Sequence, residues 1–320
     1  MTGTIKIEVS NPHVTFSLAL ERNITILCGN SATGKTTLVE MLRDFEENSS
    51  SSGVSIRCSK ACRTLSGRDW EYRLKGIENS IVFIDEGNAF VKSQAFAEAI
   101  RGSSNYYVLI TRESLYQLPY SVNSILKLKK TTSKSKKTYV KSYPQYDRLD
   151  APLRELPGLK SIITEDSNSG NDLFSYIAQQ KGIPCISAQG KSNVFPLTQK
   201  QSGNRILIVA DGAAFGAEVE KLVRFMEVHP GQLRLYLPES FEWLILKSGI
   251  LKNQTPIGIL QDPSSYIDST LYFSWEQYFT SLLIQLTQDT VMRYSKDHLN
   301  RVYLQEGNVE KLLKAMEEET

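Results

Sequence analysis

Residues 29–36 constrain this chain more than any other stretch, because they follow the spacing G-x-x-x-x-G-K-T. An apolar run over 24–28 leads into them, and residues 37–42 continue with the i, i+3, i+4 spacing of an amphipathic helix. The two glycines let the backbone turn back, so that successive N–H groups and the helix N-terminus point at one anion. A phosphate-binding P-loop between a strand and a helix is therefore expected here. Lys35 should reach the β and γ phosphates of a nucleotide, and the Thr36 hydroxyl should bind Mg²⁺.

A second strong pattern is the run Ile-Val-Phe-Ile-Asp-Glu at 81–86. Four apolar residues that end in two acids predict a buried parallel strand, whose carboxyl end brings both carboxylates beside the P-loop. In this Walker B interpretation, Asp85 orients the hydration shell of Mg²⁺ and Glu86 is the catalytic residue that polarises the attacking water. Another apolar strand, 106–110, ends at Thr111, which is placed to sense the γ-phosphate. The chain is therefore predicted to bind ATP and Mg²⁺. At this site the predicted metal ligands are Thr36 and Asp85. The predicted nucleotide-binding residues are Gly29, Asn30, Ser31, Ala32, Thr33, Gly34, Lys35, Thr36, Thr37 and Thr111.

Residues 4–9 and 14–20 alternate apolar and polar side chains, which predicts a short antiparallel pair before the P-loop strand. ATPases of the ABC class begin in this way, and this half of the chain resembles a compact, divergent member of that class. The chain departs from the class in having no Gln between Thr37 and Ser80 and in carrying Thr111 where those enzymes have a His. Phe16 could stack on adenine or belong to the core.

Residues 124–130 and 137–141 look like two strands of a basic hairpin, with no acidic residue between Lys127 and Lys141. Because the net charge of the chain is only +2, any argument for a polyanionic partner must rest on such local clustering. Lysines interleaved with tyrosines could hold a nucleic-acid backbone. Lysines also protect edge strands against aggregation, which is the alternative explanation. The nucleic-acid interpretation assigns the contact to Lys129, Lys130, Lys134, Lys136 and Lys137.

The proline-containing stretch 144–157 predicts a linker, so we expect a P-loop ATPase domain at 1–150 and a second domain at 151–320. In the second domain, strand 161–164 delivers Glu165 and Asp166, and a later strand, 205–210, delivers Asp211. A helix over 172–180 and a short strand over 183–186 lie between them, and a helix over 217–228 follows. Two parallel strands that each end in a carboxylate can converge on one metal at the C-terminal edge of a sheet.

This layout resembles the Toprim domain, the Mg²⁺-dependent fold of topoisomerases, primases and OLD-family nucleases. Those enzymes place a Glu after the first strand and an Asp-x-Asp after a later one. Glu165 and Asp211 match the first two positions, so the resemblance implies that both bind metal and act in catalysis. Ala213 stands where the second Asp is expected. The missing carboxylate could come from Glu218, Glu239 or Glu242.

An ATPase followed by a Toprim-like domain resembles OLD-type and PARIS-type anti-phage defence proteins. The resemblance implies an ATP-binding or hydrolysing enzyme whose nucleotide state controls a Mg²⁺-dependent nuclease. The alternative is an ATP-gated switch or scaffold that binds a protein partner or a second copy of the chain, with an inactive Toprim-like domain. A metabolic kinase is less favoured, because no substrate-binding signature follows the P-loop.

The expected fold class is therefore α/β: a mostly parallel P-loop sheet with N-terminal antiparallel strands, then a Toprim-like domain with a helical C-terminal tail. Asn308 is a candidate N-cap for the last helix, and nothing in this tail looks catalytic.

The cysteines are few, no signal peptide precedes the first strand and no apolar stretch is long enough for a bilayer, so we expect a cytoplasmic protein with no membrane partner. Cys58 and Cys62 are expected to be unrelated thiols rather than metal ligands.

Overall fold

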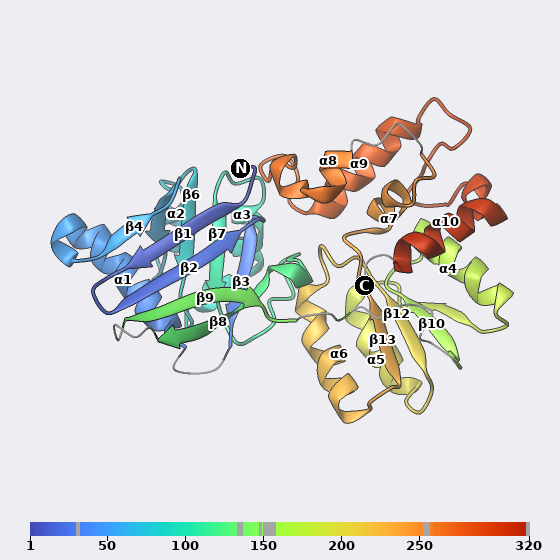
Figure 1. The fold of residues 1–320 in the computed structure, drawn as a ribbon, viewed down its shortest axis with the longest axis horizontal. Helices are drawn as coiled ribbons and strands as arrows, with labels where there is room; N and C mark the ends of the chain where they lie inside the picture. Colours follow the sequence, from blue (N-terminus) through green and yellow to red (C-terminus); the bar gives the residue numbers. More distant parts are fainter. Residues whose placement is uncertain (30–32, 133–136, 147–148, 150–157, 252–256, 318–320) are drawn as a thin grey trace. The chain divides into compact units, whose positions relative to one another are not determined.

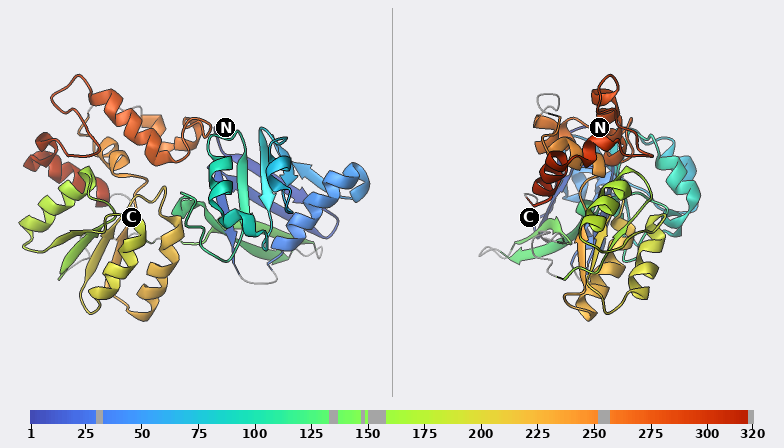
Figure 2. Two further views of the ribbon diagram at one scale, coloured as in Figure 1. Left: turned by 180° about the vertical axis from the view of Figure 1, so that it is seen from behind. Right: turned by 90° about the vertical axis from the view of Figure 1, so that its right-hand side faces the viewer.

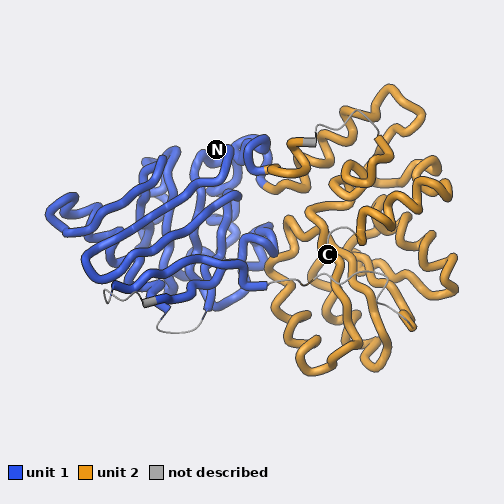
Figure 3. Tube along the Cα trace, in the orientation of Figure 1, with its two compact units in different colours: residues 1–146, 264–273 blue, residues 147–263, 274–320 orange. Residues whose placement is uncertain are grey.

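The computed structural model describes residues 1–29, 33–132, 137–146, 149, 158–251 and 257–317. The chain divides into two compact units, which are described separately (Figure 3). Unit 1 comprises Met1–Tyr146 together with Ser264–Phe273, and unit 2 comprises Asp147–Pro263 together with Ser274–Thr320. The sequence suggested one border near residue 150 and gave no sign that Ser264–Phe273 returns to the first unit.

Unit 1 is built on a large mixed sheet (Figure 1). Within the described residues it has nine strands in the order β4-β1-β2-β9-β8-β3-β7-β6-β5. The strands from β8 to β5 in this order run parallel, and β4, β1, β2 and β9 form an antiparallel wing with one parallel pairing between β2 and β9. The strands are β1 Ile5–Ser10, β2 Val14–Leu20, β3 Ile24–Cys28, β4 Ser55–Arg57, β5 Ala61–Thr64, β6 Ser80–Ile84, β7 Tyr106–Ile110, β8 Ile125–Thr132 and β9 Thr138–Pro144.

Apolar side chains cover both faces of the central strands β6 and β7, all of whose residues are buried. Helix α1, Lys35–Asn48, packs its buried face on one side of the sheet. On the other side, the ring of Tyr107 meets Phe96 of helix α3, Gln94–Ile100. Continuous apolar runs are what strands buried on both faces require, so the predictions at 81–84 and 106–110 are confirmed.

The antiparallel pair predicted at the N-terminus is also confirmed. In β1 and β2, Ile5 lies opposite Leu20 and Val9 lies opposite Phe16. The ring of Phe16 is 1% exposed and belongs to the core, as one of the two predicted alternatives had it. The basic hairpin is confirmed as β8 and β9, which lie between β3 and β2 in the strand order; β8 pairs with β3 only over Ile125–Lys127, and β9 pairs with β2 over Thr138–Lys141.

Segment Ser264–Phe273 lies along the start of unit 1. The backbone N–H of Gly3 donates to the carbonyl of Ser264, and that of Ser269 donates to the carbonyl of Met1. The Asn23 side chain, just before β3, donates to the carbonyl of Phe273 over 3.0 Å. Hydrogen bonds at several points along the segment therefore fix it to unit 1.

Unit 2 contains a second, wholly parallel sheet. Within the described part of the chain its strand order is β11-β10-β12-β13. Right-handed crossovers put helix α4 on one face and helices α5 and α6 on the other, as the opposite views in Figures 1 and 2 show. The elements are β10 Ser161–Thr164, α4 Ser169–Gln180, β11 Cys185–Ser187, α5 Lys191–Lys200, β12 Ile206–Val209, α6 Gly216–Val228 and β13 Leu233–Tyr236.

The chain ends in a helical region, in which α7, Phe241–Lys247, packs against α9, Trp275–Thr287, and α10, Glu306–Glu317. A short helix, α8, spans Ile257–Gln261. The prediction that Asn308 caps the last helix is wrong, because α10 already begins at Glu306 and the Asn308 amide donates to the carbonyl of Val302. No helix in the described ranges combines the length and apolarity that crossing a membrane requires.

Cys58 and Cys62, which were predicted to be unrelated thiols, are both free thiols, and they are close enough for Cys58 to affect the titration of Cys62. Burial first, and then the charge and hydrogen bond of Cys58, raise the pKa of Cys62. The pair is therefore a thiol contact inside unit 1.

Candidate functional site

The two glycines of this loop adopt a backbone conformation that glycine permits. Gly29 and Gly34 have φ values of +115° and +97°, in the left-handed region that favours glycine. Helix α1 begins directly after Gly34, with Lys35 as its first residue. Asn30, Ser31 and Ala32 lie outside the described residues, while Thr36 and Thr37 are exposed on the first turn of α1.

Lys35 holds the two ends of this loop together. Its ammonium Nζ donates to the carbonyl of Gly29 over 2.6 Å and to Oγ1 of Thr33 over 3.3 Å. Burial is the largest cause that lowers the pKa of Lys35, and the Arg112 guanidinium acts in the same direction. A buried cation inside a glycine-bounded loop is suited to receive an anion, because an anion would replace solvation that the fold has removed.

The carboxyl ends of three parallel strands surround this loop. Strand β7 lies between β3 and β6, so Asp85 and Glu86 are one strand further from the loop than Thr111. The charges of Glu86 and Asp85 nevertheless act on Lys35 and raise its pKa against the larger effect of burial. Thr111 is buried, and its hydroxyl accepts from the N–H of Glu113 over 3.0 Å.

Arg112 forms an ion pair with Glu86, with 3.2 Å between Nε and Oε1. The neighbouring Glu113 pairs with Lys92. Glu86, the predicted water-polarising residue, therefore has a cation beside it in this structure.

The described lysines of the basic hairpin do not all lie near this loop. Lys130 approaches the loop: a Cβ added to Gly34 would lie 3.8 Å from Cε of Lys130 and 3.1 Å from the ring of Phe16. Lys129 is exposed on the opposite face of β8, and Lys137 is half-buried just before β9. Lys134 and Lys136 lie outside the described residues.

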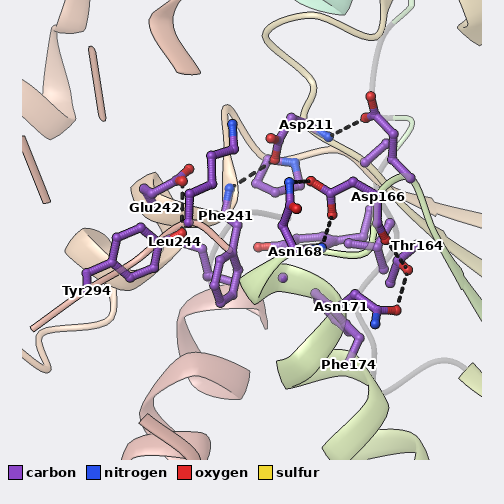
Figure 4. A pocket seen from close by; sticks show the side chains of 17 residues that line it. Thr164, Asp166, Asn168, Asn171, Phe174, Asp211, Phe241, Glu242, Leu244 and Tyr294 are labelled. Atoms are coloured by element: carbon purple, nitrogen blue, oxygen red, sulfur yellow. Dashed lines mark hydrogen bonds between the residues drawn. The ribbon is translucent and has the colours of Figure 1, made fainter. Parts of the chain in front are cut away.

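In unit 2, a cavity opens at the carboxyl ends of β10 and β12 (Figure 4). The chain leaves β10 toward β11 on one side and crosses to β12 on the other, so the two loops diverge at this point of the sheet. Ligands of open parallel sheets bind in the crevice that such a divergence creates. The cavity has a volume of about 40 Å³, enough for about three water molecules.

Glu165 and Asp211, the two predicted metal ligands, both line this cavity. Oε2 of Glu165 accepts from the N–H of Asp211 over 3.2 Å, and Oδ1 of Asp211 accepts from the N–H of Phe241 over 3.0 Å. Burial is the main cause that raises the pKa of Glu165 to about 7. Burial, followed by the charges of Glu276 and Glu242, raises the pKa of Asp211 well above its ordinary value.

Of the three candidates for a further carboxylate, Glu242 of α7 lines the cavity. It is 1% exposed, and its Oε2 is buried without a hydrogen-bond partner. Glu218 is buried on α6 and pairs with Lys221, 3.5 Å away. Glu239 contributes its backbone carbonyl, which accepts from the N–H of Ala213 over 3.2 Å.

The C-terminal region supplies two residues that sequence analysis missed. Tyr294 and Lys296 line the cavity from the loop after α9. The Tyr294 hydroxyl donates to Oε1 of Glu242, and the Lys296 ammonium pairs with Glu276. Burial lowers the pKa of Lys296, but the charge and hydrogen bond of Glu276 outweigh it, so the pKa is raised.

Whether a divalent metal fits this cavity depends on the carboxylate oxygens that line it. Among the residues that the structure describes, no three His, Cys, Asp or Glu side chains form a group that could hold a metal ion. Mg²⁺, however, often binds through one or two carboxylates, keeps several waters and takes further oxygens from a substrate phosphate. Glu165 and Asp211, with a water-sized cavity and the unpartnered buried oxygen of Glu242, fit that mode.

No family model matches this chain, and no curated protein matches it either. The loop around Lys35 and the cavity around Asp211 are the two features from which a function can be argued.

Proposed function

We propose that this chain is an ATP-binding protein whose unit 2 hydrolyses nucleic-acid phosphodiesters with Mg²⁺, under the control of the nucleotide state of unit 1. The observation that carries the proposal is the convergence of Glu165, Asp211 and Glu242 on one cavity at the divergence point of a parallel sheet. Burial and the charges of neighbouring carboxylates disfavour the ionised forms of Glu165 and Asp211, and a bound cation would stabilise those forms.

Unit 2 supplies the groups that such a reaction needs. Glu165 and Asp211 would hold Mg²⁺, which when bound polarises a phosphoryl oxygen and lowers the pKa of a coordinated water. Glu242 fixes the opposite wall through its hydrogen bond with Tyr294. Lys296 lines the cavity, and its ammonium, which pairs with Glu276, would be close enough to a substrate in the cavity to bind a phosphate oxygen.

Unit 1 supplies the nucleotide site in this proposal. Lys35 would exchange its bonds to Gly29 and Thr33 for bonds to the phosphates, and Thr111 would contact the terminal phosphate from β7. The Thr36 hydroxyl and the Asp85 carboxylate are the ligand types that Mg²⁺ takes beside phosphates. Because Glu86 is paired with Arg112, water activation at this site requires that pair to separate.

Cleavage assays on the full chain test the proposal. With labelled DNA and RNA, ATP and Mg²⁺, we expect cleavage that EDTA abolishes and that is lost in Glu165→Ala and Asp211→Asn. Glu218→Gln is the matched control, because it also changes a buried carboxylate of unit 2 but one that pairs with Lys221. Cleavage that survives Glu165→Ala would show that the cavity is not the site.

A second candidate, an ATP-gated scaffold with an inactive unit 2, is supported by a separate observation. Ala213, at the position of the expected second Asp, is 3% exposed, and its N–H continues the hydrogen bonding between β12 and β13. The backbone at Ala213 is therefore hydrogen-bonded to the neighbouring chain segment after β13. This candidate predicts no cleavage with any divalent metal, and assembly with a protein partner or a second copy that requires ATP and is lost in Lys35→Ala.

A further inference from the structure

Edge protection does not account for all the lysines of the basic hairpin. Lysines often protect the exposed edge of a sheet. Strand β8 pairs with β3 only over Ile125–Lys127, so among the described residues its outer edge beyond Lys127 has no partner strand, whereas β9 pairs with β2 over Thr138–Lys141. Lys141 therefore lies where both edges of its strand are paired, and edge protection does not explain it.

The register of the hairpin separates its two faces. Leu126 and Leu128 of β8 and Val140 of β9 are buried against the core. On the opposite face, Lys129 lies directly across from Lys141. Like charges in directly opposed positions destabilise a sheet, and no carboxylate lies between Lys127 and Lys141 to offset them.

Two tyrosines flank this lysine pair on the same face of β9. Tyr139 and Tyr143 are two residues to either side of Lys141, and successive side chains of a strand alternate between faces. They are 41% and 42% exposed. The ammonium of Lys129 lies 5.1 Å from the centre of the Tyr143 ring. Along β9 the order on this face is therefore ring, cation, ring, and the second cation lies across from the first on β8.

The strands beside the hairpin add no negative charge to this face. On β2, Thr15 lies beside Tyr139 and Ser17 lies beside Lys141. Beyond them, on β1, Glu8 carries a carboxylate on the same face, and it pairs with Arg57 of β4 at 3.4 Å. The outer surface of β8 and β9 is therefore positive, aromatic and bordered by neutral side chains.

We infer that this surface, formed by Lys129, Tyr139, Lys141 and Tyr143, binds single-stranded nucleic acid. Bases stack on the two tyrosine rings, and the lysine ammonium groups neutralise the phosphates between them. Proteins that bind single strands combine these two elements, because every base has a face that can stack. A duplex keeps its bases stacked inside, so it could use the lysines but not the rings. The inference names a substrate class for the proposed nuclease, but the binding itself does not require the cavity of unit 2 to be catalytic.

Fluorescence anisotropy with the full chain tests this inference. The probe is a labelled oligothymidylate of about 15 nucleotides, compared with a duplex of the same length, in EDTA and without nucleotide. Under these conditions neither cleavage nor ATP binding contributes, so a failure here is distinct from a failure of the proposed function. We expect the single strand to bind more tightly than the duplex.

The variants separate stacking from charge. Tyr139→Ala and Tyr143→Ala should each weaken single-strand binding about 5- to 100-fold, while Tyr143→Phe should retain it. The double change Lys129→Ala with Lys141→Ala should reduce the slope of log affinity against log salt by about 1.4, since each phosphate contact on a single strand contributes about 0.7. Lys75→Ala, an exposed lysine just after helix α2, Trp70–Leu74, is the charge-matched control and should leave both unchanged.

Equal binding of single strand and duplex with no effect of the tyrosine changes would overturn the inference. So would an affinity that the paired lysine change leaves intact, or the absence of measurable binding at low salt. Circular dichroism of each variant establishes that it is folded, and the paired lysine change keeps the inference testable if a tyrosine-to-alanine variant is not folded.

Discussion

The hydroxyl of Tyr294 donates a 2.9 Å hydrogen bond to Oε1 of Glu242, joining the loop after α9 to helix α7 inside a solvent-excluded wall of the cavity. The other oxygen of Glu242 has no hydrogen-bond partner. We expect Tyr294→Phe to lower the free energy of unfolding by about 1–3 kcal/mol, because it leaves the Glu242 carboxylate buried without a donor. Denaturant unfolding measures this loss.

A double-mutant cycle completes that test. Adding Glu242→Gln to Tyr294→Phe should cost less than the sum of the two single changes, since the penalty belongs to the buried carboxylate. Tyr176→Phe, on the half-exposed side of α4, is the control for loss of a hydroxyl. Strictly additive effects would mean that the two side chains do not stabilise each other.

Glu165 should make the metal-free protein less stable as the pH rises from about 5 to 8. Burial raises the pKa of Glu165 from 4.5 to about 7, so the folded protein binds this proton more tightly than the unfolded chain does. Stability is then lost as the pH rises through that window. In EDTA, the melting temperature of Glu165→Gln should match the wild type near pH 5 and exceed it near pH 8. The exposed Glu227→Gln should show no such divergence.

Lys35→Met should remove stabilisation by ATP without weakening the nucleotide-free protein. Burial lowers the pKa of Lys35, so its charged form is held at a cost that methionine avoids while filling similar space. ATP at 100 times its dissociation constant should stabilise the wild type by about 2.7 kcal/mol. Thermal shift with and without ATP measures both effects, with Lys75→Met as the control. A full ATP shift in Lys35→Met would contradict the assignment of Lys35.

Gly212 should tolerate no side chain. A Cβ at this position would lie 2.3 Å from the carbonyl oxygen of Leu237 and 2.9 Å from that of Pro238, both backbone atoms. We expect Gly212→Ala to destabilise the protein by about 3 kcal/mol or to prevent unit 2 from folding. Gly307→Ala in α10 meets nothing within 4 Å and should be neutral or slightly stabilising. Equal stability of the two variants would show that the loops after β12 and β13 can move apart.

The sequence predicted best what depends on local pattern. The buried strands β6, β7, β10 and β12 and the polar residues that follow them all come from apolar runs with polar ends. The order of strands was beyond such patterns, because the position of the hairpin between β2 and β3 is set by pairing between distant segments. Helix α5, with Pro196 inside it, and the short strand β13 carry weak signals and were not predicted.

In the cavity, too, only the residues that follow a local pattern could be predicted. Glu165 and Asp211 follow strands, so their type and position were visible in the sequence. Tyr294 and Lys296 come from a loop more than 80 residues beyond Asp211, and no local pattern marks them. What could have drawn attention to them is the acidity of the cavity, since several buried carboxylates require donors or cations from elsewhere in the chain.

Segment Ser264–Phe273 bears on how such a protein can change over time. Because the chain enters unit 1 a second time before it finishes unit 2, no single cut separates a complete unit 1 from a complete unit 2. A recombination event at the linker would transfer a unit 1 without its last segment, or a unit 2 interrupted by residues that belong elsewhere. Exchange of either complete unit with another protein therefore requires more than one break in the chain.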